Sequence, residues 1–319
     1  KNKRMKILAN DGLAASGIIA LEDAGFEVLT TTVAQDQLEN FINENNVVVL
    51  LVRSATTVRK ELIDATNLKI IGRGGVGMDN IDVDYARAKG ISVINTPAAS
   101  SHSVAELVFA HLFGMVRFLH DSNRAMPLDG DTKFKGLKKA YAKGRELKGK
   151  TIGIFGFGRI GQETAKIALG VGMKVIAFDP FLEKVHIDLD FFDGQKVGFD
   201  IVTQSKENVL KEADFFSFHV PAQKDYLISN AEFDMMKTGA ALVNAARGGV
   251  IDEVALVDAL ESGKVAYAGV DTFENEPTPA IKLLMLPNVS LTPHIGAATL
   301  EAQDRIGLEL ASQIISILK

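Results

Sequence analysis

The sequence predicts an α/β protein built from two doubly wound parallel sheets, with helices on both faces of each sheet. Short apolar runs alternate with helical patterns along most of the 319 residues, which is the rhythm of β-α-β units. The run Ile152–Phe155 is short, apolar and followed by a glycine-rich turn, as expected of a central strand buried on both faces. A chain of this length has room for two domains and a sizeable core.

Composition excludes several classes of protein. The formal net charge of −5 argues against a general nucleic-acid binder, and 47% hydrophobic with 24% charged residues is ordinary for a globular protein. The absence of cysteine excludes disulfides, thiolate catalysis and zinc–thiolate sites. The same absence of cysteine favours a reducing cytoplasm as the location. No apolar run reaches membrane-spanning length and the start lacks a signal peptide's apolar segment, so we expect no membrane partner. Because position 1 is Lys1, we expect the numbering to begin inside the natural chain.

The first third predicts a parallel sheet, and ligands of such sheets bind beyond the carboxyl ends of the strands. Two of these ends have positive charge, because Arg53-Ser54 follows one strand and Arg73-Gly-Gly-Val-Gly77 follows another. A single arginine there is usually a solvated loop residue, but two at one rim favour an anion site. The predicted strands are Lys6–Ala9, Phe26–Leu29, Val47–Val52, Lys69–Gly72 and Ser92–Asn95, with helices near 14–24, 35–45, 58–66 and 82–89.

A long helix is predicted at about 103–120. Ser103 and Glu106 have the spacing of a capping box, which marks its start. Its apolar residues cover more than one face, which suits a helix that passes between domains or lies in an interface. Its two histidines, His111 and His120, are expected to be structural.

The glycine-rich turn predicts a nucleotide site. After the buried strand, Gly156 permits a tight turn, Gly158 lets the backbone approach a pyrophosphate, and Gly161 lets the next helix pack close to the strand. The N-terminus of that helix presents free N–H groups and partial positive charge to phosphates. Such a glycine pattern alone is weak evidence, so its context decides.

The context is a second strand that ends in an acid, Lys174–Asp179. Asp179 follows Gly161 at close to the ~20 residues expected for the carboxylate that binds the adenosine ribose. Pro180 comes next, with no nearby Arg or Lys to bind a 2′-phosphate, so the predicted cofactor is NAD. The alternative for Asp179 is a turn-forming acid before proline.

Two stretches lack the regular spacing of apolar residues that marks a helix or a strand. Residues 121–150 are rich in lysine, so we expect a solvated crossover in which one or two lysines face an anionic ligand. Residues 181–203 are irregular, with Val197–Thr203 expected to form an extra strand. The α/β rhythm then resumes with helices Glu207–Ala213, Asn230–Lys237, Asp252–Gly263 and about 299–318, and strands Phe215–His219, Ala241–Ala246, Ala266–Val270 and Val289–Thr292.

Polar residues follow three of these strands. Arg247 follows one strand, Asp271 and Glu276 follow the next, and His294 follows the last. Taken singly, these could be a surface cap, a turn acid before Pro277 and a satisfied loop histidine. Because parallel strands bring their carboxyl ends to one edge, we interpret the three together as one site in the crevice of the cofactor.

The chemistry suits oxidation of a 2-hydroxy acid. An alcohol that loses hydride needs a base for its hydroxyl proton, and His294 can take that proton. Glu276 is placed to bond the other ring nitrogen and fix its tautomer, while Arg247 can hold a substrate carboxylate bidentately. His219, before Val220-Pro221, is expected to shape a loop beside the nucleotide, and the six histidines form no metal-ligand pattern.

At these residues the sequence resembles the D-2-hydroxyacid dehydrogenase family, and within it the phosphoglycerate dehydrogenases. The similarity covers nearly the whole chain. The resemblance implies a Rossmann-type NAD domain, 98–292, inserted in a flavodoxin-like substrate domain made of 1–97 and 293–319. It also implies a homodimer, or a dimer of dimers, formed through the helix after Pro97. The matching motifs are Gly72-Arg-Gly-Gly-Val-Gly-Met-Asp-Asn-Ile-Asp82, Asn95-Thr-Pro97, Ser103-Val-Ala-Glu106, Gly156-Phe-Gly-Arg-Ile-Gly161, Asn244-Ala-Ala-Arg-Gly-Gly249, Asp271-Thr-Phe-Glu-Asn-Glu-Pro277 and Thr292-Pro-His-Ile-Gly-Ala297.

The resemblance further implies the ligand contacts, without a metal. It implies the catalytic roles already given to Arg247, Glu276 and His294, and places Asp271 beside the nicotinamide. The implied cofactor contacts are Val104, Gly156, Gly158, Arg159, Ile160, Gly161, Asp179, Pro180, His219, Val220, Pro221, Ala245, Ala246, Asp271 and Gly296. The implied substrate contacts are Arg53, Ser54, Arg73, Gly74, Gly75, Val76 and Lys139.

The activity implied is NAD-dependent oxidation of D-3-phosphoglycerate to 3-phosphohydroxypyruvate for serine synthesis. One alternative is a reductase of glyoxylate, hydroxypyruvate or another 2-keto acid, and another is an NAD(H)-sensing protein like the corepressors of this fold. The chain departs from the family pattern after His219-Val-Pro221, where the loop is shorter and lacks its usual threonine, and at 181–203, which is longer. Because it ends at Lys319, we expect a short form without a regulatory domain, and hence no inhibition by L-serine.

Overall fold

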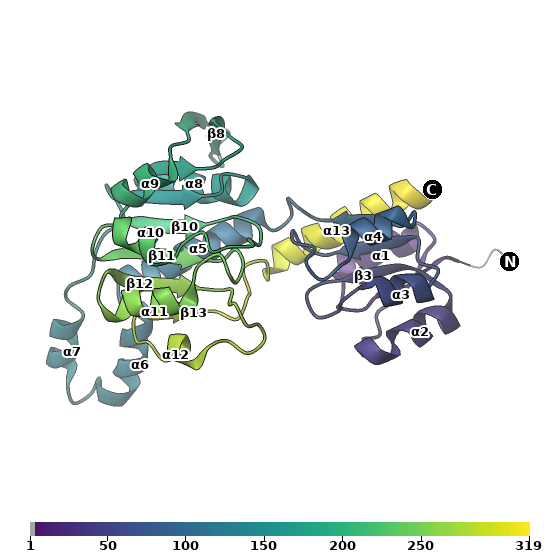
Figure 1. Cartoon of the computed structure of the whole chain (residues 1–319), viewed down its shortest axis with the longest axis horizontal. Coiled ribbons are helices and arrows are strands. Elements are labelled where there is room, and N and C mark those ends of the chain that lie inside the picture. The colour runs from purple at the N-terminus through teal and green to yellow at the C-terminus, as the bar shows by residue number, and fades with distance from the viewer. Residues whose placement is uncertain (1–3) are drawn as a thin grey trace. The chain divides into compact units, whose positions relative to one another are not determined.

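The computed structural model describes residues 4–319 and divides into two compact units (Figure 1). The first unit is Lys1–Ser103 with Ala297–Lys319, and the second is Val104–Gly296. The expected domain limits, at 97 and 293, lie a few residues from these. Each unit contains one open parallel sheet with helices on both faces, which confirms the predicted α/β class.

The sheet of the first unit has the strand order β2-β1-β3-β4-β5, and all its pairs are parallel. This is the flavodoxin-like order, in which the chain reverses direction across the sheet beside β1. Predicted and observed limits agree closely, because short apolar runs between turn residues mark each strand. The strands are β1 Lys6–Ala9, β2 Glu27–Leu29, β3 Val47–Val52, β4 Ile70–Arg73 and β5 Ser92–Asn95.

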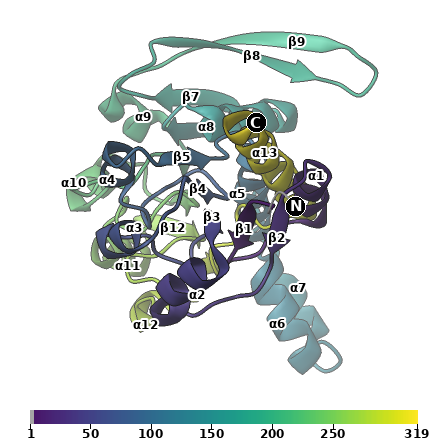
Figure 2. The ribbon, with the colours of Figure 1, turned by 90° about the vertical axis from the view of Figure 1, so that its right-hand side faces the viewer.

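Helices cover both faces of this sheet. Alternate residues of β1 belong to two separate cores, Leu8 to one and Ile7 to the other. Helices α1, Ala15–Asp23, and α13, Leu300–Leu318, lie side by side (Figure 2). A Cβ added to Gly17 would stand only 2.7 Å from the Cα of Gly307. Glycine at this crossing is therefore what lets the two helix backbones touch. The helical segments are α1 Ala15–Asp23, η1 Gln35–Gln37, α2 Leu38–Asn45, α3 Lys60–Ala65, α4 Val83–Ala88 and α13 Leu300–Leu318.

The sheet of the second unit has the order β13-β12-β11-β10-β6-β7, again entirely parallel. It follows the Rossmann arrangement, with β6 between β10 and β7 and the chain reversing beside it. Its core also lies on both faces, because Phe155 and Ile154 of β6 enter different clusters. The strands are β6 Thr151–Phe155, β7 Lys174–Phe178, β10 Phe215–Phe218, β11 Ala240–Asn244, β12 Val265–Val270 and β13 Val289–Leu291.

The prediction for 181–203 was incomplete. A single extra strand was expected, but this stretch forms an antiparallel hairpin of β8 Lys184–Asp190 and β9 Lys196–Val202. The hairpin stands where a Rossmann sheet usually has its third parallel strand. Val185 and Ile201 pack towards the core that includes helix α8, Arg159–Val171, while Phe192 at the turn is exposed. Figure 2 shows the hairpin extended alongside β7.

The single helix predicted at 103–120 was also wrong. Helix α5 begins at Ser101 and ends at Val116, Phe118 adopts a left-handed φ of 54°, and a second helix starts at Leu119. Ser103 therefore lies within the helix rather than capping it, and its hydroxyl contacts that of Thr299 at 2.9 Å.

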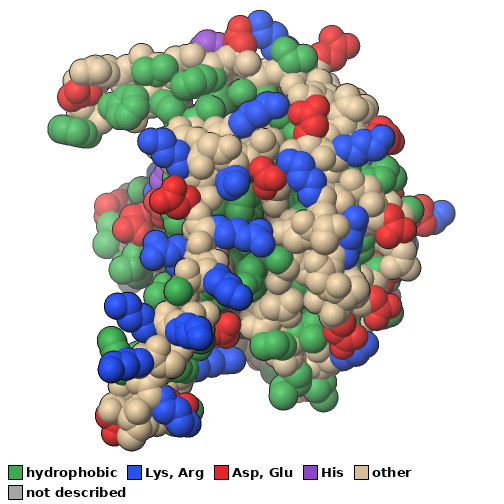
Figure 3. Space-filling model, turned by 90° about the vertical axis from the view of Figure 1, so that its left-hand side faces the viewer, with side chains coloured by type: hydrophobic (Ala, Val, Ile, Leu, Met, Phe, Trp, Pro, Cys, Tyr) green, Lys and Arg blue, Asp and Glu red, His purple; other side chains and the backbone are tan. Residues whose placement is uncertain are grey.

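The segment 121–150 contains more helix than its sequence pattern predicted. Helices α6 and α7 form an exposed arm with no buried residue, and Lys and Arg gather on it in Figure 3. Within residues 4–319 no single helix is long and apolar enough to cross a membrane; α5 and α6 meet that criterion only as a pair bent by 54°. The helices of the second unit are α5 Ser101–Val116, which spans the boundary, α6 Leu119–Asp129, α7 Phe134–Ala140, α8 Arg159–Val171, α9 Lys206–Glu212, α10 Asn230–Met235, α11 Glu253–Glu261 and α12 Ile281–Leu284.

Candidate active site

The catalytic candidates of the second unit follow three neighbouring strands. Arg247 follows β11, Asp271 and Glu276 follow β12, and His294 follows β13, in the order β11-β12-β13 across the sheet. Parallel pairing places these loops at the same edge. The structure thus brings the residues expected to form the site to one rim of one unit.

His294 and Glu276 form a direct hydrogen bond. Nδ1 of His294 lies 2.8 Å from Oε2 of Glu276, and the other carboxylate oxygen accepts the N–H of Phe273 at 3.0 Å. Because an ionised carboxylate only accepts, Nδ1 of a neutral His294 is the protonated nitrogen. The lone pair is then on Nε2, which can accept a proton from a substrate hydroxyl.

Asp271 supports the histidine loop from beneath. Its carboxylate is 1% exposed and accepts hydrogen bonds from Thr292 Oγ1 at 2.6 Å, Ile295 N at 2.8 Å and Gly296 N at 3.0 Å. The loop needs this support, because His294 has a left-handed φ of 53°, which is unfavourable for a residue with a side chain. Family resemblance placed Asp271 beside the nicotinamide, and in the structure its oxygens hold the loop backbone.

Arg247 lies in a turn fixed by Asn244, a residue that sequence reasoning did not select. Asn244 Oδ1 accepts the N–H of Ala246 at 3.1 Å, and its Nδ2 donates to the carbonyl of Arg247 at 3.0 Å. The guanidinium donates to the carbonyl of Ala246 at 2.6 Å and is partly exposed. Ala245 and Ala246, expected near the cofactor, form this same turn.

The glycine turn has the shape that the sequence predicted. Gly156 has φ +85°, and a Cβ there would stand 2.4 Å from the carbonyl oxygen of His219. A Cβ at Gly161 would overlap the carbonyl of Gly156, so the helix α8 packs directly on the turn. Gly158 is exposed, has open space around it and begins α8 without a side-chain cap. The N-terminus of α8 is therefore accessible to an anion, with Arg159 and Ile160 in its first turn.

Asp179 joins the second strand to the glycine turn. Its Oδ2 accepts the N–H of Phe157 at 2.7 Å, and its Oδ1 accepts that of Phe181 at 2.9 Å. The sequence allowed Asp179 to be a turn-forming acid or the carboxylate that binds the ribose. The structure gives a basis for both, because the carboxylate shapes the turn around Pro180 and also lies beside the glycine turn. Each carboxylate oxygen keeps a further lone pair, so the pair of ribose hydroxyls of NAD fits this group.

His219 supports the glycine turn from below. Its Nε2 contacts Ser217 Oγ at 2.8 Å and Thr164 Oγ1 at 3.1 Å, and burial of the ring lowers the pKa of His219 to about 3. The imidazole is therefore neutral near pH 7. The next residue, Val220, lies against Gly156, and Pro221 is exposed. Val104 and Gly296, two further expected cofactor contacts, are also neighbours. A Cβ added to Gly296 would lie 3.3 Å from a Cγ atom of Val104.

The first unit contains the expected anion-binding residues. Val52 and Arg73 pair across β3 and β4, so Arg53 and Arg73 stand at adjacent strand ends. A side chain at Gly75 would collide with the Arg73 guanidinium, and Gly74 lies against Arg53 Cγ. Ser54 and Val76 are exposed in the same two loops. Lys139 lies on α7 of the second unit, with its side chain exposed.

Two residues that sequence reasoning missed fix the Arg53 loop. Asp11 accepts the N–H of Arg53 at 2.6 Å and of Thr56 at 3.1 Å, while Asn80 donates to the carbonyls of both. Asp11 closely follows the first strand, so its position beyond a strand end was a usable signal. Among the residues of the two described units, no cluster of three His, Asp or Glu is arranged to hold a metal ion.

The glycine turn with its carboxylate, and the His–Glu pair beside an arginine, define a dinucleotide-dependent dehydrogenase of hydroxy acids. Residues 109–296 match the family described as "D-isomer specific 2-hydroxyacid dehydrogenase, NAD binding domain". The chain belongs to this family, and it is an NAD-dependent dehydrogenase. The resemblance seen in the motifs and the NAD prediction are thereby confirmed.

Individual relatives differ in substrate. The chain is 43% identical to hydroxypyruvate reductase of Thermotoga maritima, over 99% of both chains. It is 40% identical to D-3-phosphoglycerate dehydrogenase of Methanocaldococcus jannaschii, covering 99% of this chain but only 58% of that one. Among solved structures, a glyoxylate reductase from Paecilomyes thermophila matches with a TM-score of 0.81 at 30% identity, over 100% and 96% of the two chains. D-lactate dehydrogenase from Aquifex aeolicus, complexed with NAD and lactic acid, matches with a TM-score of 0.74 at 28% identity, over 99% and 95%.

Proposed function

We propose that this protein oxidises D-3-phosphoglycerate to 3-phosphohydroxypyruvate with NAD. The observation behind the proposal is the pair of guanidinium groups, Arg53 and Arg73, at the ends of two adjacent strands, in addition to Arg247. Phosphoglycerate has two anionic groups, a carboxylate and a phosphate. Arginine binds both kinds of group bidentately, so these three side chains supply a cation for each.

The proposed reaction assigns one role to each catalytic side chain. Arg247 binds the substrate carboxylate and orients C2. NAD, which the glycine turn and Asp179 would hold, would supply the acceptor for the hydride of C2. Nε2 of His294 takes the proton of the C2 hydroxyl as the carbonyl forms, and Glu276 holds the resulting imidazolium through its bond to Nδ1. Arg53 and Arg73 bind the phosphate, with Ser54, Gly74, Gly75, Val76 and Lys139 as further substrate contacts.

A second candidate is the reduction of hydroxypyruvate. Its support is the similarity to the Thermotoga reductase, which matches along its whole length, whereas the chain spans little more than half of the phosphoglycerate dehydrogenases. Hydroxypyruvate has a carboxylate but no phosphate, so Arg247 would bind it without need of the arginine pair on the first unit. The two candidates therefore differ in what Arg53 and Arg73 contribute.

Steady-state kinetics with five substrates tests the proposal. We expect the highest kcat/KM with D-3-phosphoglycerate in the oxidative direction, above D-glycerate, and lower values for hydroxypyruvate and glyoxylate with NADH. A kcat/KM for hydroxypyruvate that exceeds that for 3-phosphohydroxypyruvate would replace the proposal with the reductase. Absence of turnover on all substrates, with NADH still bound, would favour the NAD(H)-sensing protein.

We also propose that the product feeds serine synthesis in the cytoplasm and that the protein is a homodimer. The lack of cysteine supports a reducing compartment. Exposed apolar side chains on the arm after α5, among them Leu128 at 79% and Phe134 at 57%, support an interface through α5 and this arm. Sedimentation of the wild type and Leu128→Glu tests this, since the charge should shift a dimer towards monomer.

A further inference from the structure

His111 makes two hydrogen bonds that the sequence did not predict. It lies on α5 with 3% exposure, its Nδ1 is 2.8 Å from Ser290 Oγ, and its Nε2 is 3.0 Å from Thr292 Oγ1. Gly269 of β12 makes room for it, because a Cβ there would stand 2.8 Å from Cβ of His111. The ring is therefore fitted against the end of the sheet that leads into the His294 loop.

The direction of these hydrogen bonds follows from the groups themselves. Thr292 has a single hydroxyl proton and donates it to Oδ1 of Asp271 at 2.6 Å. Thr292 Oγ1 can then only accept from His111, so Nε2 of His111 has the proton. Nδ1 is left to accept the hydroxyl proton of Ser290. Burial lowers the pKa of His111, which keeps the ring neutral and this tautomer populated.

The chain of donors ends on the loop that holds the base. Asp271 receives the Thr292 hydroxyl on Oδ1 and uses its two oxygens to bind the N–H groups of Ile295 and Gly296, which follow His294. A left-handed backbone at a residue such as His294 persists only when its surroundings hold it. His111 therefore orients the hydroxyl of Thr292. That hydroxyl in turn orients the carboxylate of Asp271, which holds the backbone of the His294 loop.

We infer that His111 is a positioning residue for His294, acting through Thr292 and Asp271. The inference rests on the proposed role of His294 as the base. It assigns a function to a buried histidine for which the sequence predicted only a structural role. Removal of the Nε2 donor leaves Thr292 free to rotate its hydroxyl away from Asp271, so the loop loses one of the bonds that orient the base.

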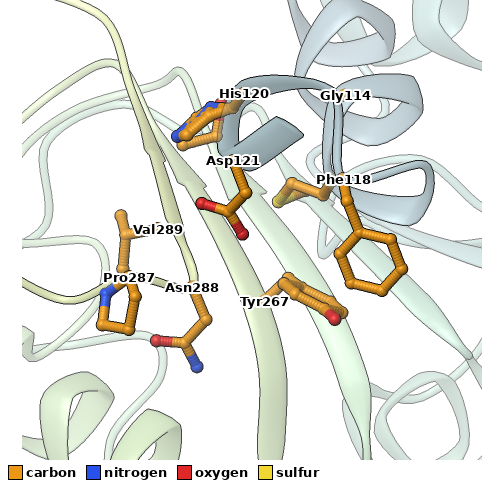
Figure 4. A pocket seen from close by; sticks show the side chains of 10 residues that line it. Gly114, Phe118, His120, Asp121, Tyr267, Pro287, Asn288 and Val289 are labelled. Carbon is orange, nitrogen blue, oxygen red and sulfur yellow. The ribbon is translucent and has the colours of Figure 1, made fainter. Parts of the chain in front are cut away.

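Ser290, which bonds the other nitrogen of the His111 ring, provides a matched control. Ser290 also lines a small cavity at the bend between α5 and α6, where Asp121 and Tyr267 point inward (Figure 4). Its volume of about 20 Å³ is room for roughly one water molecule. In Ser290→Ala a water can therefore replace the hydroxyl at Nδ1 of His111, and the bond from Nε2 to Thr292 stays intact.

The experiment compares three variants, His111→Leu, His111→Gln and Ser290→Ala. His111→Leu removes the donor, and kcat should fall about tenfold while the Kd for NADH and the substrate KM stay within about twofold, since a misaligned base affects only the chemical step. His111→Gln keeps an N–H donor and should recover most of that kcat. Ser290→Ala should resemble the wild type. Equal losses of kcat in His111→Leu and His111→Gln would overturn the inference, because packing alone would then explain them.

A double-mutant cycle covers the case in which His111→Leu folds poorly. Thr292→Val alone should lower kcat about as much as His111→Leu, and the two together should cost little more than either, because both break one chain. Additive losses would contradict the relay. His294→Ala, measured beside them, tests the proposed base separately from the positioning role. Near-normal turnover of His294→Ala would show that the proposed base is wrong. The difference in kcat between His111→Leu and His111→Gln tests the positioning role.

Discussion

Glu276 Oε2 lies 2.8 Å from Nδ1 of His294, so the nitrogen left for a substrate is Nε2. The bond joins residues from the loops after β12 and β13, and its partner oxygen is anchored on the N–H of Phe273. The side chains of both residues are more than a third exposed, at 39% for His294 and 37% for Glu276, which leaves them open to a ligand. The pair has the orientation of a general base held by a carboxylate.

His294→Ala should keep NADH binding and lower kcat by roughly 10²–10⁴, the usual contribution of general acid–base catalysis. Fluorescence titration with NADH and steady-state rates measure the two quantities. His186→Ala, which removes an exposed histidine from the hairpin, is the control and should leave kcat unchanged. Near-normal turnover of His294→Ala would remove this residue from the mechanism.

Asp179 should set the preference for NAD, because a 2′-phosphate would meet its negative charge. Asp179→Asn keeps an oxygen for only one of the two backbone N–H groups, those of Phe157 and Phe181, and removes the charge, so the ratio of kcat/KM for NAD over NADP should fall about tenfold or more. Asp179→Ala should narrow the preference similarly while also weakening the glycine turn. A wild type that uses both cofactors equally would contradict this assignment.

Arg53→Ala tests the phosphate site. Charge-assisted bonds are worth about 1.5–3 kcal/mol, so kcat/KM for phosphoglycerate should fall about tenfold to a hundredfold. The effect on D-glycerate, which lacks the phosphate, should be small. Arg59→Ala is the matched control, because Arg59 pairs with Asp82 on the surface of the same unit. Equal losses on both substrates would mean that Arg53 binds the carboxylate or supports the fold.

Glu253→Gln should stabilise the protein at neutral pH. Glu253 is 8% exposed, and burial, with the charges of Glu274 and Glu276, raises its pKa. The folded state then binds a proton more tightly than the unfolded chain, so this group's contribution to stability is present at low pH and lost as pH rises through the raised pKa. Glutamine keeps the acceptor for the Glu274 N–H, so the free energy of unfolding at pH 7 should rise by up to about 1 kcal/mol.

The gain in Glu253→Gln should shrink as the pH falls towards the ordinary pKa of a glutamate, about 4.3, because below it the wild-type carboxyl is protonated in both states. Urea unfolding at several pH values measures this. Glu207→Gln, an exposed acid in the first turn of α9, is the control and should show no such gain. A loss of stability in Glu253→Gln at every pH would contradict the prediction.

His219 should make the protein sensitive to acid. Its pKa is lowered to about 3, so the unfolded chain binds a proton between pH 6.5 and 3 that the folded state does not. Stability from this residue is complete above pH 6.5 and should fall by about 2 kcal/mol between pH 7 and pH 5. His219→Asn should flatten that part of the curve. The exposed His186, whose pKa is raised by Asp200, should have the opposite and smaller effect when replaced.

The strands and the catalytic pair could be predicted because local sequence determines them. Each strand is a short apolar run between turn residues, and His294 and Glu276 each follow such a run. The hairpin was only half predicted, although Lys184–Asp190 alternates polar and apolar residues as a half-buried strand does. The same alternation marks β9, which was predicted as the strand Val197–Thr203, so β8 was predictable from the same signal.

Other features depend on contacts between distant residues. The break at Phe118 has no glycine or proline to mark it, and its ring instead packs 5.9 Å from those of Tyr141 and Tyr267. Asp11 holds the Arg53 loop across more than forty residues, which no local pattern reveals. The hydroxyl of Thr292 similarly acquires its role only when α5 brings His111 to the end of β13.

The packing of α13 on the first sheet has a consequence for synthesis on the ribosome. Ile306, Leu310 and Ile314 of α13 complete the core that contains Ile7 and Val49. Part of one face of the first sheet must therefore stay uncovered until α13, Leu300–Leu318, has been translated. Domains usually fold in the order in which they emerge, at about 5–20 residues per second. Here the second unit can fold before the first is complete. Until α13 has been synthesised, the apolar side chains of the first sheet that it covers stay accessible to chaperones and prone to aggregation.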